Sequence, residues 1–354
     1  MGVTRRGFLG ESVLLAGGLA TGVGSAGGPR ILNRNENMEY RRCGKTGLMV
    51  SAVCLGGHWK RIETVVPDAL KTKNWLNVDV AHGEFAKNRH DVVSRCMDVG
   101  INYIDACTGP EVMAYAAALR GRRDKMYLGY SWYDREVRYP DWRSTGKLLQ
   151  GFDDGLRAAG LDYVDLWRIT CHEPGGQHTF NESEALVTAL DKAKRQGKAR
   201  FTGISSHDRR WLKMMIEQYP DQIDVILTPY TADSKVLPKD SLFDTVRKYG
   251  VGVFGIKPFA SNALFQGDSR PGGPYAEEDN RRARLALRYV LGNAAITAPI
   301  PGMVNIEQVN NAAKAVMERR RLDEKETADL KQAAGEMWAN LPDHYQWLKN
   351  WEYV

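Results

Sequence analysis

The sequence GINYIDA, Gly100–Ala106, marks a boundary between a helix and a strand in this 354-residue chain. Its first glycine ends a helical segment, Asn88–Val99, and its last residues form a short β-rich run, Tyr103–Ala106. Glycines also end the helical segments Phe152–Ala159 and Glu182–Gln196, and a β-rich run follows each of them. The chain is therefore predicted to alternate helices and strands.

Eight β-rich runs predict the architecture. In chain order they are Val50–Leu55, Tyr103–Ala106, Met126–Tyr130, Tyr163–Ile169, Phe201–Ile204, Asp224–Leu227, Gly252–Ile256 and Ile296–Ile300. Eight strands with intervening helices are typical of an α/β fold, the (β/α)8 TIM barrel, which commonly reaches this length as a single domain. Functional side chains are then expected at the carboxyl ends of the strands. The unusually long connection between residues 59 and 87 is expected to take part in the site.

Composition argues against several classes of function. The 49 basic and 43 acidic residues give a formal charge of +6, but they are spread along the chain without a long basic run, so no nucleic-acid partner is expected. The five cysteines include no C-x-x-C pair. The chain therefore lacks the pattern of a zinc finger or of a disulfide framework.

The N-terminal residues 1–26 indicate a twin-arginine export signal. Two adjacent arginines, Arg5 and Arg6, precede an apolar stretch, Ser12–Val23, and small residues end at Ala26. The apolar stretch is shorter than the ~20 residues that a membrane-spanning helix needs. We therefore expect recognition by the twin-arginine export machinery, cleavage near Ala26, no stable membrane anchor afterwards, and a periplasmic or extracellular location.

The rest of the chain is predicted to divide into three parts. Residues 27–37 are polar and glycine-rich and predict a linker, residues 38–317 form the barrel, and residues 318–354 form a helical extension. The extension is rich in aromatic residues, namely Trp338, Tyr345, Trp347, Trp351 and Tyr353. We expect these side chains either to pack against the barrel or to cover its mouth and shape a pocket.

Three separated segments resemble the aldo/keto reductase family. They are MEYRRCGKTGLMVSAVCLGG at Met38–Gly57, GINYIDA, and GKARFTGISSHD at Gly197–Asp208, and the resemblance extends to about Ala315. It implies hydride transfer between a nicotinamide and a carbonyl, assisted by a tetrad of Asp, Tyr, Lys and His. Asp105 matches the family Asp. The positions of the other three residues are occupied by Pro110, Ser131 and Thr170.

The resemblance therefore implies a rearranged acid–base set. Arg168 has the same strand parity as Thr170, so it is expected to point into the barrel and to pair with Asp105. There it either replaces the lost lysine or only neutralises a buried carboxylate. Tyr130 is a candidate for the replacement phenol, and His58 or His172 for the replacement acid.

The family's cofactor segments are better preserved. The residues that correspond to them are Ser205, Ser206, Tyr230, Lys257 and Gly302. The resemblance implies NAD or NADP as the cofactor. Met303 and Val304 supply no cation for the 2′-phosphate of NADP, so NAD is favoured, and the helix expected near Ile306 is suited to attract a phosphate.

Three functions are open from the sequence. The first is an exported, NAD(P)-linked oxidoreductase that acts on a carbonyl or sugar-like substrate. The second is a barrel without redox activity that binds a carbohydrate or a partner. The third is a metal-assisted hydrolase or isomerase that uses the strand-end histidines His58, His172 and His207. The first function is favoured because the cofactor segments persist. For that function no metal site is expected.

Overall fold

The computed structural model of the chain describes residues 30–72, 74, 76–172 and 177–351. The predicted export signal, residues 27–29 of the predicted linker, and Tyr353 thus lie outside the described residues. Within the described ranges, no helix is long and apolar enough to cross a membrane.

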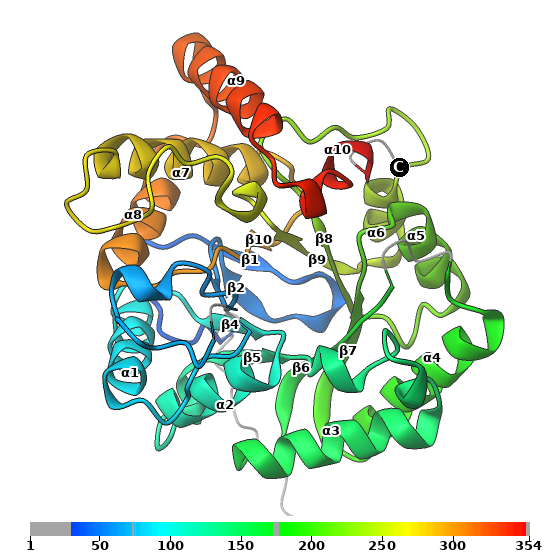
Figure 1. The fold of residues 1–354 in the computed structure, drawn as a ribbon. Coiled ribbons are helices and arrows are strands. Elements are labelled where there is room, and N and C mark those ends of the chain that lie inside the picture. The colour runs from blue at the N-terminus through cyan, green and yellow to red at the C-terminus, as the bar shows by residue number, and fades with distance from the viewer. Residues whose placement is uncertain (1–29, 73, 75, 173–176, 352–354) are drawn as a thin grey trace, which may run out of the picture.

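Eight parallel strands form the predicted barrel (Figure 1). They are β3 (Leu55–Gly56), β4 (Tyr103–Ala106), β5 (Tyr127–Tyr130), β6 (Val164–Thr170), β7 (Ala199–Ser205), β8 (Val225–Pro229), β9 (Gly252–Ile256) and β10 (Ala298–Pro299). Each strand pairs with its neighbours in chain order. The barrel is closed by a parallel bridge between Gly56 and Gly302 and by the Gly56 N–H, which donates to the carbonyl of Pro301. The fold is therefore the (β/α)8 barrel.

The first predicted strand, Val50–Leu55, is wrong as a single element. Its start belongs to β2 (Met49–Ser51), which pairs antiparallel with β1 (Tyr40–Arg42) at the amino-terminal end of the barrel. Only its last residue joins the barrel, in β3. The hydroxyl of Ser51 donates to the carbonyl of Val53, and this local hydrogen bond interrupts the extended run.

Helices α1 to α8 surround the strands (Figure 1). They are α1 (Gly83–Asp98), α2 (Gly109–Ala118), α3 (Thr145–Ala159), α4 (Phe180–Arg195), α5 (Arg209–Gln218), α6 (Leu242–Tyr249), α7 (Ala276–Leu291) and α8 (Ile306–Met317). The predicted helix Phe152–Ala159 is the second half of α3. It begins earlier because Ser144 caps it by accepting from the N–H of Lys147, and it ends at Gly160, whose φ is +64°.

Short 3-10 helices lie in the connections. They are η1 (Gly44–Thr46), η2 (Ile62–Thr64), η3 (Arg123–Lys125), η4 (Tyr133–Arg135), η5 (Pro140–Trp142) and η7 (Ala260–Asn262). Below the carboxyl ends of the strands the barrel interior is filled by apolar side chains, and Tyr103 stacks on Phe254 with ring centroids 4.4 Å apart. This packed interior confines any site to the carboxyl-terminal mouth of the barrel.

The C-terminal residues form α9 (Glu324–Ala339), η8 (Asp343–Tyr345) and α10 (Leu348–Trp351). One face of α9, which includes Leu330 and Met337, packs in an apolar cluster with Leu285 of α7. In Figure 1 this segment, drawn in red, runs from the outside of α7 to the region above the ends of β8 and β9. The extension therefore reaches the barrel mouth, as one of the two sequence-based expectations for it required.

Candidate functional site

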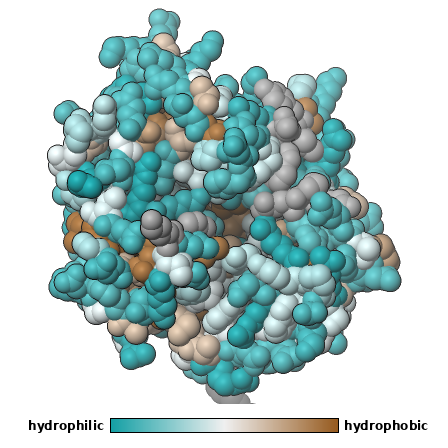
Figure 2. All heavy atoms as spheres, in the orientation of Figure 1, coloured by the Kyte–Doolittle hydropathy of each residue, from teal (hydrophilic) through white to brown (hydrophobic). Residues whose placement is uncertain are grey.

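A cavity of about 420 Å³ opens at the carboxyl ends of the strands. Its inner part is lined by Asp105, Arg168 and Thr170 above the barrel interior. It continues as a groove between the loop after β9, the start of α7 and the segment that leads into α8. Figure 2 shows that the surrounding face is largely hydrophilic, with apolar residues in the hollow near its middle. The position and shape of the cavity suit an extended ligand.

The floor of the cavity is the ion pair between Asp105 on β4 and Arg168 on β6. The Nη2 atom of Arg168 lies 2.5 Å from Oδ2 of Asp105, and Nε donates to Oδ1 at 3.3 Å. Both side chains are buried, with 3% and 6% exposed. Burial alone would lower the pKa of Arg168, but the carboxylate of Asp105 raises this pKa well above its ordinary value. The predicted pairing is confirmed, and Arg168 is a fixed positive charge that cannot serve as a proton donor.

The side chains at the family's Lys and His positions belong to a hydrogen-bond network around this pair. The guanidinium of Arg168 donates to the hydroxyl of Thr170 at 2.7 Å, which lies 2.8 Å from the hydroxyl of Ser131. Ser131 donates to the carboxylate of Glu136 at 2.6 Å. Burial raises the pKa of Glu136. The network satisfies buried polar groups, and hydroxyls stand where the family has an ammonium and an imidazole.

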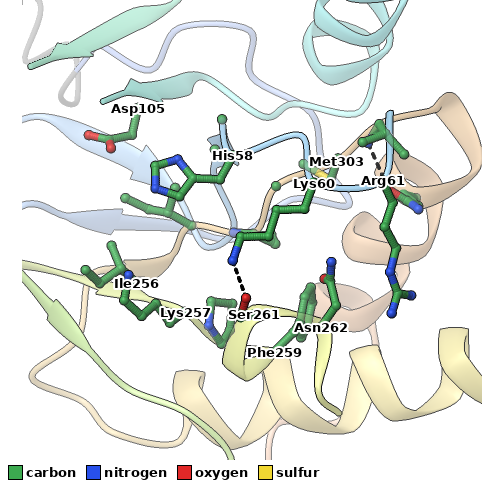
Figure 3. A pocket seen from close by; sticks show the side chains of 18 of the residues that line it. His58, Lys60, Arg61, Asp105, Ile256, Lys257, Phe259, Ser261, Asn262 and Met303 are labelled. Carbon is green, nitrogen blue, oxygen red and sulfur yellow. Dashed lines mark hydrogen bonds between the residues drawn. The ribbon is translucent and has the colours of Figure 1, made fainter. Parts of the chain in front are cut away.

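His58 and Glu111 form a second pair, at the edge of the cavity. The Nδ1 atom of His58 lies 2.8 Å from Oε1 of Glu111, and the side chain of His58 is 37% exposed. In Figure 3 the ring of His58 extends toward the side on which Asp105 lies. Burial alone would raise the pKa of Glu111, but the charge of His58 and hydrogen bonds from His58 and from the N–H of Cys107 lower it. The pair is therefore an imidazole held by an ionised carboxylate, an arrangement suited to proton transfer.

The start of α2 fixes Glu111 in this position. Glu111 is the third residue of a capping box in which Thr108 accepts from its N–H. Its carboxylate also accepts from the N–H groups of Cys107, at 2.7 Å, and His58, at 2.5 Å. A Cβ atom on Gly57 would lie 2.1 Å from the carboxyl carbon of Glu111, so the turn that carries His58 requires glycine there. His58 itself has a φ of +59°, which is an uncommon conformation for a residue other than glycine.

Tyr130 and His172 do not line the cavity, so neither provides the replacement acid expected from the sequence. Tyr130 faces the helices because its neighbour Gly129 faces the barrel interior, and its ring packs edge-on against Phe152 of α3 at 5.2 Å. His172 turns away, and its Nε2 atom lies 2.8 Å from the guanidinium of Arg143. Burial and the charge of Arg143 lower the pKa of His172. His58 is the candidate acid that the structure brings to the cavity.

Of the five candidate cofactor residues, three line the cavity and two do not. Ser205, Lys257 and Gly302 line the cavity. Ser206 does not: it is buried, and its hydroxyl donates to the carbonyl of His172 at 3.3 Å. Tyr230 is also buried away from the cavity, and packs edge-on against a phenylalanine of α6 at 5.8 Å. The strand periodicity that brings Ser205 to the cavity directs the next residue away from it.

Gly302 has a structural role besides its place in the lining. A Cβ atom on Gly302 would lie 2.4 Å from the carbonyl oxygen of Gly57, so glycine is needed where β3 and β10 close the barrel. Beyond Gly302, the groove is lined by Asn305, Gln308 and Asn311 at the start of α8. Asn305 caps this helix by accepting from the N–H of Gln308 at 2.8 Å. Amide side chains and a helix N-terminus fit the phosphates and sugars of a dinucleotide.

Lys60 and Arg61 of the cavity were not identified from the sequence, whereas Tyr345 and Trp347 belong to the aromatic residues that were expected to pack on the barrel or cover its mouth. Lys60 and Arg61 come from the long connection after β3, which was expected to take part in the site. Tyr345 and Trp347 come from the C-terminal extension, and the ring of Trp347 stacks on His207 with centroids 4.2 Å apart. The T-x-x-E pattern of Thr108–Glu111 was a readable signal for the cap that holds Glu111, but not for its contact with His58.

The strand-end histidines do not form a metal site in the described part of the chain. There, no group of three or more His, Cys, Asp or Glu side chains is placed to share a metal ion. His172 lies outside the cavity lining, and His58 is paired with Glu111. The described residues therefore give the metal-assisted hydrolase or isomerase no ligand set.

Comparison with known proteins identifies the family. The model of the aldo/keto reductase family matches residues 85–284. L-glyceraldehyde 3-phosphate reductase of Escherichia coli (strain K12) is 26% identical over 251 residues, which are 65% of this chain and 64% of that protein. L-galactose dehydrogenase of Arabidopsis thaliana is 28% identical over 197 residues, 51% of this chain and 60% of that protein. The chain thus spans less than two thirds of either relative.

A solved structure shows the same fold. The holo form of an aldo-keto reductase from Bacillus halodurans superimposes with a TM-score of 0.60 at 22% identity. The match covers 84% of this chain and 96% of that chain. At this level of identity the likeness establishes the barrel and leaves the chemistry to the residues of the site.

Proposed function

Because the chain belongs to the aldo/keto reductase family, we propose that it is an NAD(P)-linked oxidoreductase with a rearranged acid, which interconverts a carbonyl or sugar-like compound and the corresponding alcohol. The observation that carries the proposal is the His58–Glu111 pair at the edge of the cavity whose floor is the Asp105–Arg168 pair. The His58–Glu111 pair replaces the proton-transfer group that Pro110 and Ser131 cannot supply.

The residues of the cavity divide the work of the reaction. A bound nicotinamide supplies the hydride in reduction and accepts it in oxidation. His58, in its protonated form, donates a proton to the carbonyl oxygen as negative charge develops there, and the neutral ring takes the proton back in the reverse direction. Glu111 orients the ring through the contact of its carboxylate with Nδ1 of His58. The Asp105–Arg168 pair keeps the floor of the cavity charged and rigid without exchanging protons.

The groove suits the remainder of a dinucleotide. Asn305, Gln308 and Asn311 would contact its adenosine half. NAD remains the favoured cofactor because Met303 and Val304 are buried apolar residues and bring no cation to this segment. Arg270 also lines the groove, but Asp268 lies 3.4 Å from its guanidinium. The names of the two relatives, a reductase of a sugar phosphate and a dehydrogenase of a sugar, support a sugar-like substrate.

The proposal includes export. The twin-arginine pattern at residues 4–9 favours folding before export, and a periplasmic or extracellular location for the mature protein. Folding first would let the protein carry a nicotinamide nucleotide into a compartment that has little of it. Export after folding would be compatible with a site that binds a dinucleotide.

The decisive experiment is to purify the protein from its native export route and identify what it releases on denaturation by absorbance and mass spectrometry. A stoichiometric nicotinamide nucleotide, or saturable binding of added NAD or NADP, together with turnover of a sugar aldehyde, supports the oxidoreductase. If no nucleotide is released and neither NAD nor NADP binds, the proposal fails.

One observation favours a second candidate, a barrel that binds carbohydrate without redox chemistry. Tyr345 and Trp347 bring two aromatic rings to the cavity, with centroids 5.5 Å apart, and aromatic faces commonly stack on sugar rings. This candidate predicts saturable sugar binding in the absence of nucleotide and no turnover when nucleotide is added. Binding and turnover assays on the same preparation of protein distinguish this candidate from the oxidoreductase.

A further inference from the structure

A buried carboxylate behind the floor of the cavity begins a hydrogen-bond chain with a fixed direction. Glu136 follows β5 and the short helix η4, is 2% exposed and does not line the cavity. Its carboxylate accepts from the N–H of Thr170 at 2.7 Å, from the N–H of Trp132 at 3.1 Å and from the hydroxyl of Ser131 at 2.6 Å. Peptide N–H groups can only donate, so these contacts keep both oxygens of Glu136 as acceptors.

This geometry favours the ionised form of Glu136. Burial raises the pKa of Glu136, although the hydrogen bonds from Ser131 and Thr170 and the charge of Arg168 oppose the rise. An ionised carboxylate accepts all three hydrogen bonds, whereas a carboxylic acid would have to turn one oxygen into a donor. The single hydrogen of the Ser131 hydroxyl is therefore directed to Glu136.

The direction of the chain determines what the hydroxyl of Thr170 can do. The hydroxyl oxygens of Thr170 and Ser131 are 2.8 Å apart. Because the hydrogen of Ser131 is directed to Glu136, Thr170 is the donor between the two hydroxyls. Thr170 also accepts from the guanidinium of Arg168 at 2.7 Å. Its one hydrogen and one of its two lone pairs are thus in use, and the second lone pair is left as an acceptor.

Among the described residues, the remaining contact of this hydroxyl is a weak one. The sulfur of Cys107 lies 3.7 Å from the hydroxyl oxygen of Thr170. A thiol is a poor hydrogen-bond donor, so a hydroxyl group of a ligand would form a stronger hydrogen bond with Thr170. Thr170 and Cys107 both line the cavity, whereas Ser131 does not. At Thr170 the floor of the cavity therefore offers an acceptor and no hydroxyl hydrogen.

We propose that Thr170 selects substrates with a hydroxyl group on the carbon next to the carbonyl, because the chain to Glu136 leaves the Thr170 hydroxyl able only to accept. A substrate hydroxyl can donate to Thr170, whereas a carbonyl or a methylene group at the same position cannot. His58 lines the same cavity, and in Figure 3 its ring extends toward the side on which Asp105 lies. A compact substrate can therefore place its carbonyl near His58 and its hydroxyl at Thr170. The inference names the substrate class of the proposed oxidoreductase and rests on that function for its link to turnover.

Three aldehydes that differ only at the carbon next to the carbonyl test this selection. Lactaldehyde carries a hydroxyl there, methylglyoxal a second carbonyl and propanal a methylene group. In the natural protein kcat/KM should be higher for lactaldehyde than for propanal, and Thr170→Val should lower this ratio by about threefold to tenfold. Thr170→Ser keeps the hydroxyl and should retain most of the ratio, which separates a lost contact from a misfolded variant. Thr327→Val removes an exposed hydroxyl of α9 and should leave the ratio unchanged.

Ser131→Ala tests the direction of the chain. This variant removes the acceptor of the Thr170 hydrogen, while Glu136 keeps its two N–H partners. The Thr170 hydroxyl can then donate into the cavity, so the ratio of kcat/KM for methylglyoxal to kcat/KM for lactaldehyde should rise by about threefold or more. An unchanged ratio in Ser131→Ala, or an unchanged ratio of lactaldehyde to propanal in Thr170→Val, would overturn the inference.

A titration without turnover separates this inference from the proposed function. Propylene glycol has the hydroxyl that n-propanol lacks, and the binding of each alcohol to the full-length protein, free of nucleotide, can be followed by nuclear magnetic resonance. Propylene glycol should bind more tightly by about threefold or more, and Thr170→Val should abolish the difference. Equal affinities of the natural protein for the two alcohols would overturn the inference. If the difference is found but no aldehyde is reduced with NADH or NADPH, the oxidoreductase proposal fails and the role of Thr170 in binding a hydroxyl group stands.

Discussion

The floor and the rim of the cavity use charged residues in opposite ways. On the floor, Asp105 and Arg168 are almost fully buried, lie at strand ends and satisfy one another. On the rim, His58 is more than one third exposed and is held by a carboxylate from a helix cap, while Lys60 and Tyr345 come from a long loop and from the C-terminal extension. The comparison teaches that the strand ends have kept the family's charge but not its proton donor. On the proposed function, proton transfer has moved to the connection after β3, which carries His58.

The largest expected effect tests the rim. His58→Gln should lower kcat/KM for carbonyl reduction by about 10²–10⁴-fold, because a neutral amide cannot donate the proton that the alkoxide needs. The measurement is steady-state kinetics with NADH or NADPH, alongside nucleotide binding, which should persist. His90→Gln, on the exposed side of α1, is the matched control and should have wild-type activity. Activity of His58→Gln within about twofold of the natural protein would show that His58 is not the proton donor.

The next effect tests the floor. Arg168→Met leaves the buried carboxylate of Asp105 without its partner, and should lower the free energy of unfolding by about 3–5 kcal/mol, measured by urea denaturation. The double variant Asp105→Asn with Arg168→Met removes both charges and should be more stable than Arg168→Met alone. Arg157→Met, which breaks an exposed pair on α3, should cost about 1 kcal/mol or less. Equal stabilities of the two Arg168 variants would show that the charges are not coupled.

The strands of the barrel were predictable from the sequence to different degrees. The alternation of β-rich runs and glycine-terminated helices is a local pattern, and two strands, β4 and β9, begin and end at the predicted residues. The first strand divides where the hydroxyl of Ser51 donates to the carbonyl of Val53, a contact that a pattern of apolar residues does not predict. Local periodicity therefore predicts the barrel better than it predicts its first element.

The candidate site was predictable where strand parity applies. The pairing of Arg168 with Asp105 followed from parity on β6. Parity on β5 also explains the error at Tyr130, because Gly129 is in register with the inward-facing Asp105 and directs Tyr130 outward. The approach of Lys60 to Tyr345, which lies 285 residues away along the chain, has no local signal. Such contacts depend on how a long loop and a terminal extension fold over the barrel.

A smaller effect concerns His178, which packs beside His172 outside the cavity lining. Burial and the neighbouring His172 lower the pKa of His178 to about 4, and its Nε2 atom accepts from the N–H of His172 at 2.8 Å. The unfolded chain takes up this proton near pH 6.5, so the associated stability is complete above pH 6.5 and is lost as the pH falls toward 4. His178→Gln keeps an acceptor but does not titrate. Its free energy of unfolding should decline less steeply than that of the natural protein between pH 6.5 and 4.

Urea midpoints at several pH values across this range measure the difference. His90→Gln removes an exposed histidine and should follow the natural protein at every pH. Parallel curves for His178→Gln and the natural protein would mean that the ring is protonated as readily in the folded chain as in the unfolded chain.

The smallest effect concerns the attachment of the extension that carries Tyr345. Arg288 of α7 is 3% exposed and binds both carboxylate oxygens of Glu326 of α9, at 2.8 and 2.9 Å, and this lowers the pKa of Glu326 to about 2. The stabilisation is present above the unfolded pKa of about 4.3 and is lost as the pH falls toward 2. Glu326→Gln should therefore lower the Tm by a few degrees at pH 7, and the difference should close between pH 4.3 and 2.

The exposed neighbour Glu324, in the same first turn of α9, provides the control. Glu324→Gln should leave Tm nearly unchanged, since Glu324 does not take part in the fork with Arg288. The floor of the cavity, built entirely from strand ends, should keep the pairing of Asp105 with Arg168 in Glu326→Gln. A variant that lowers Tm equally at pH 7 and pH 2.5 would show that Glu326 acts through helix capping and not through its charge.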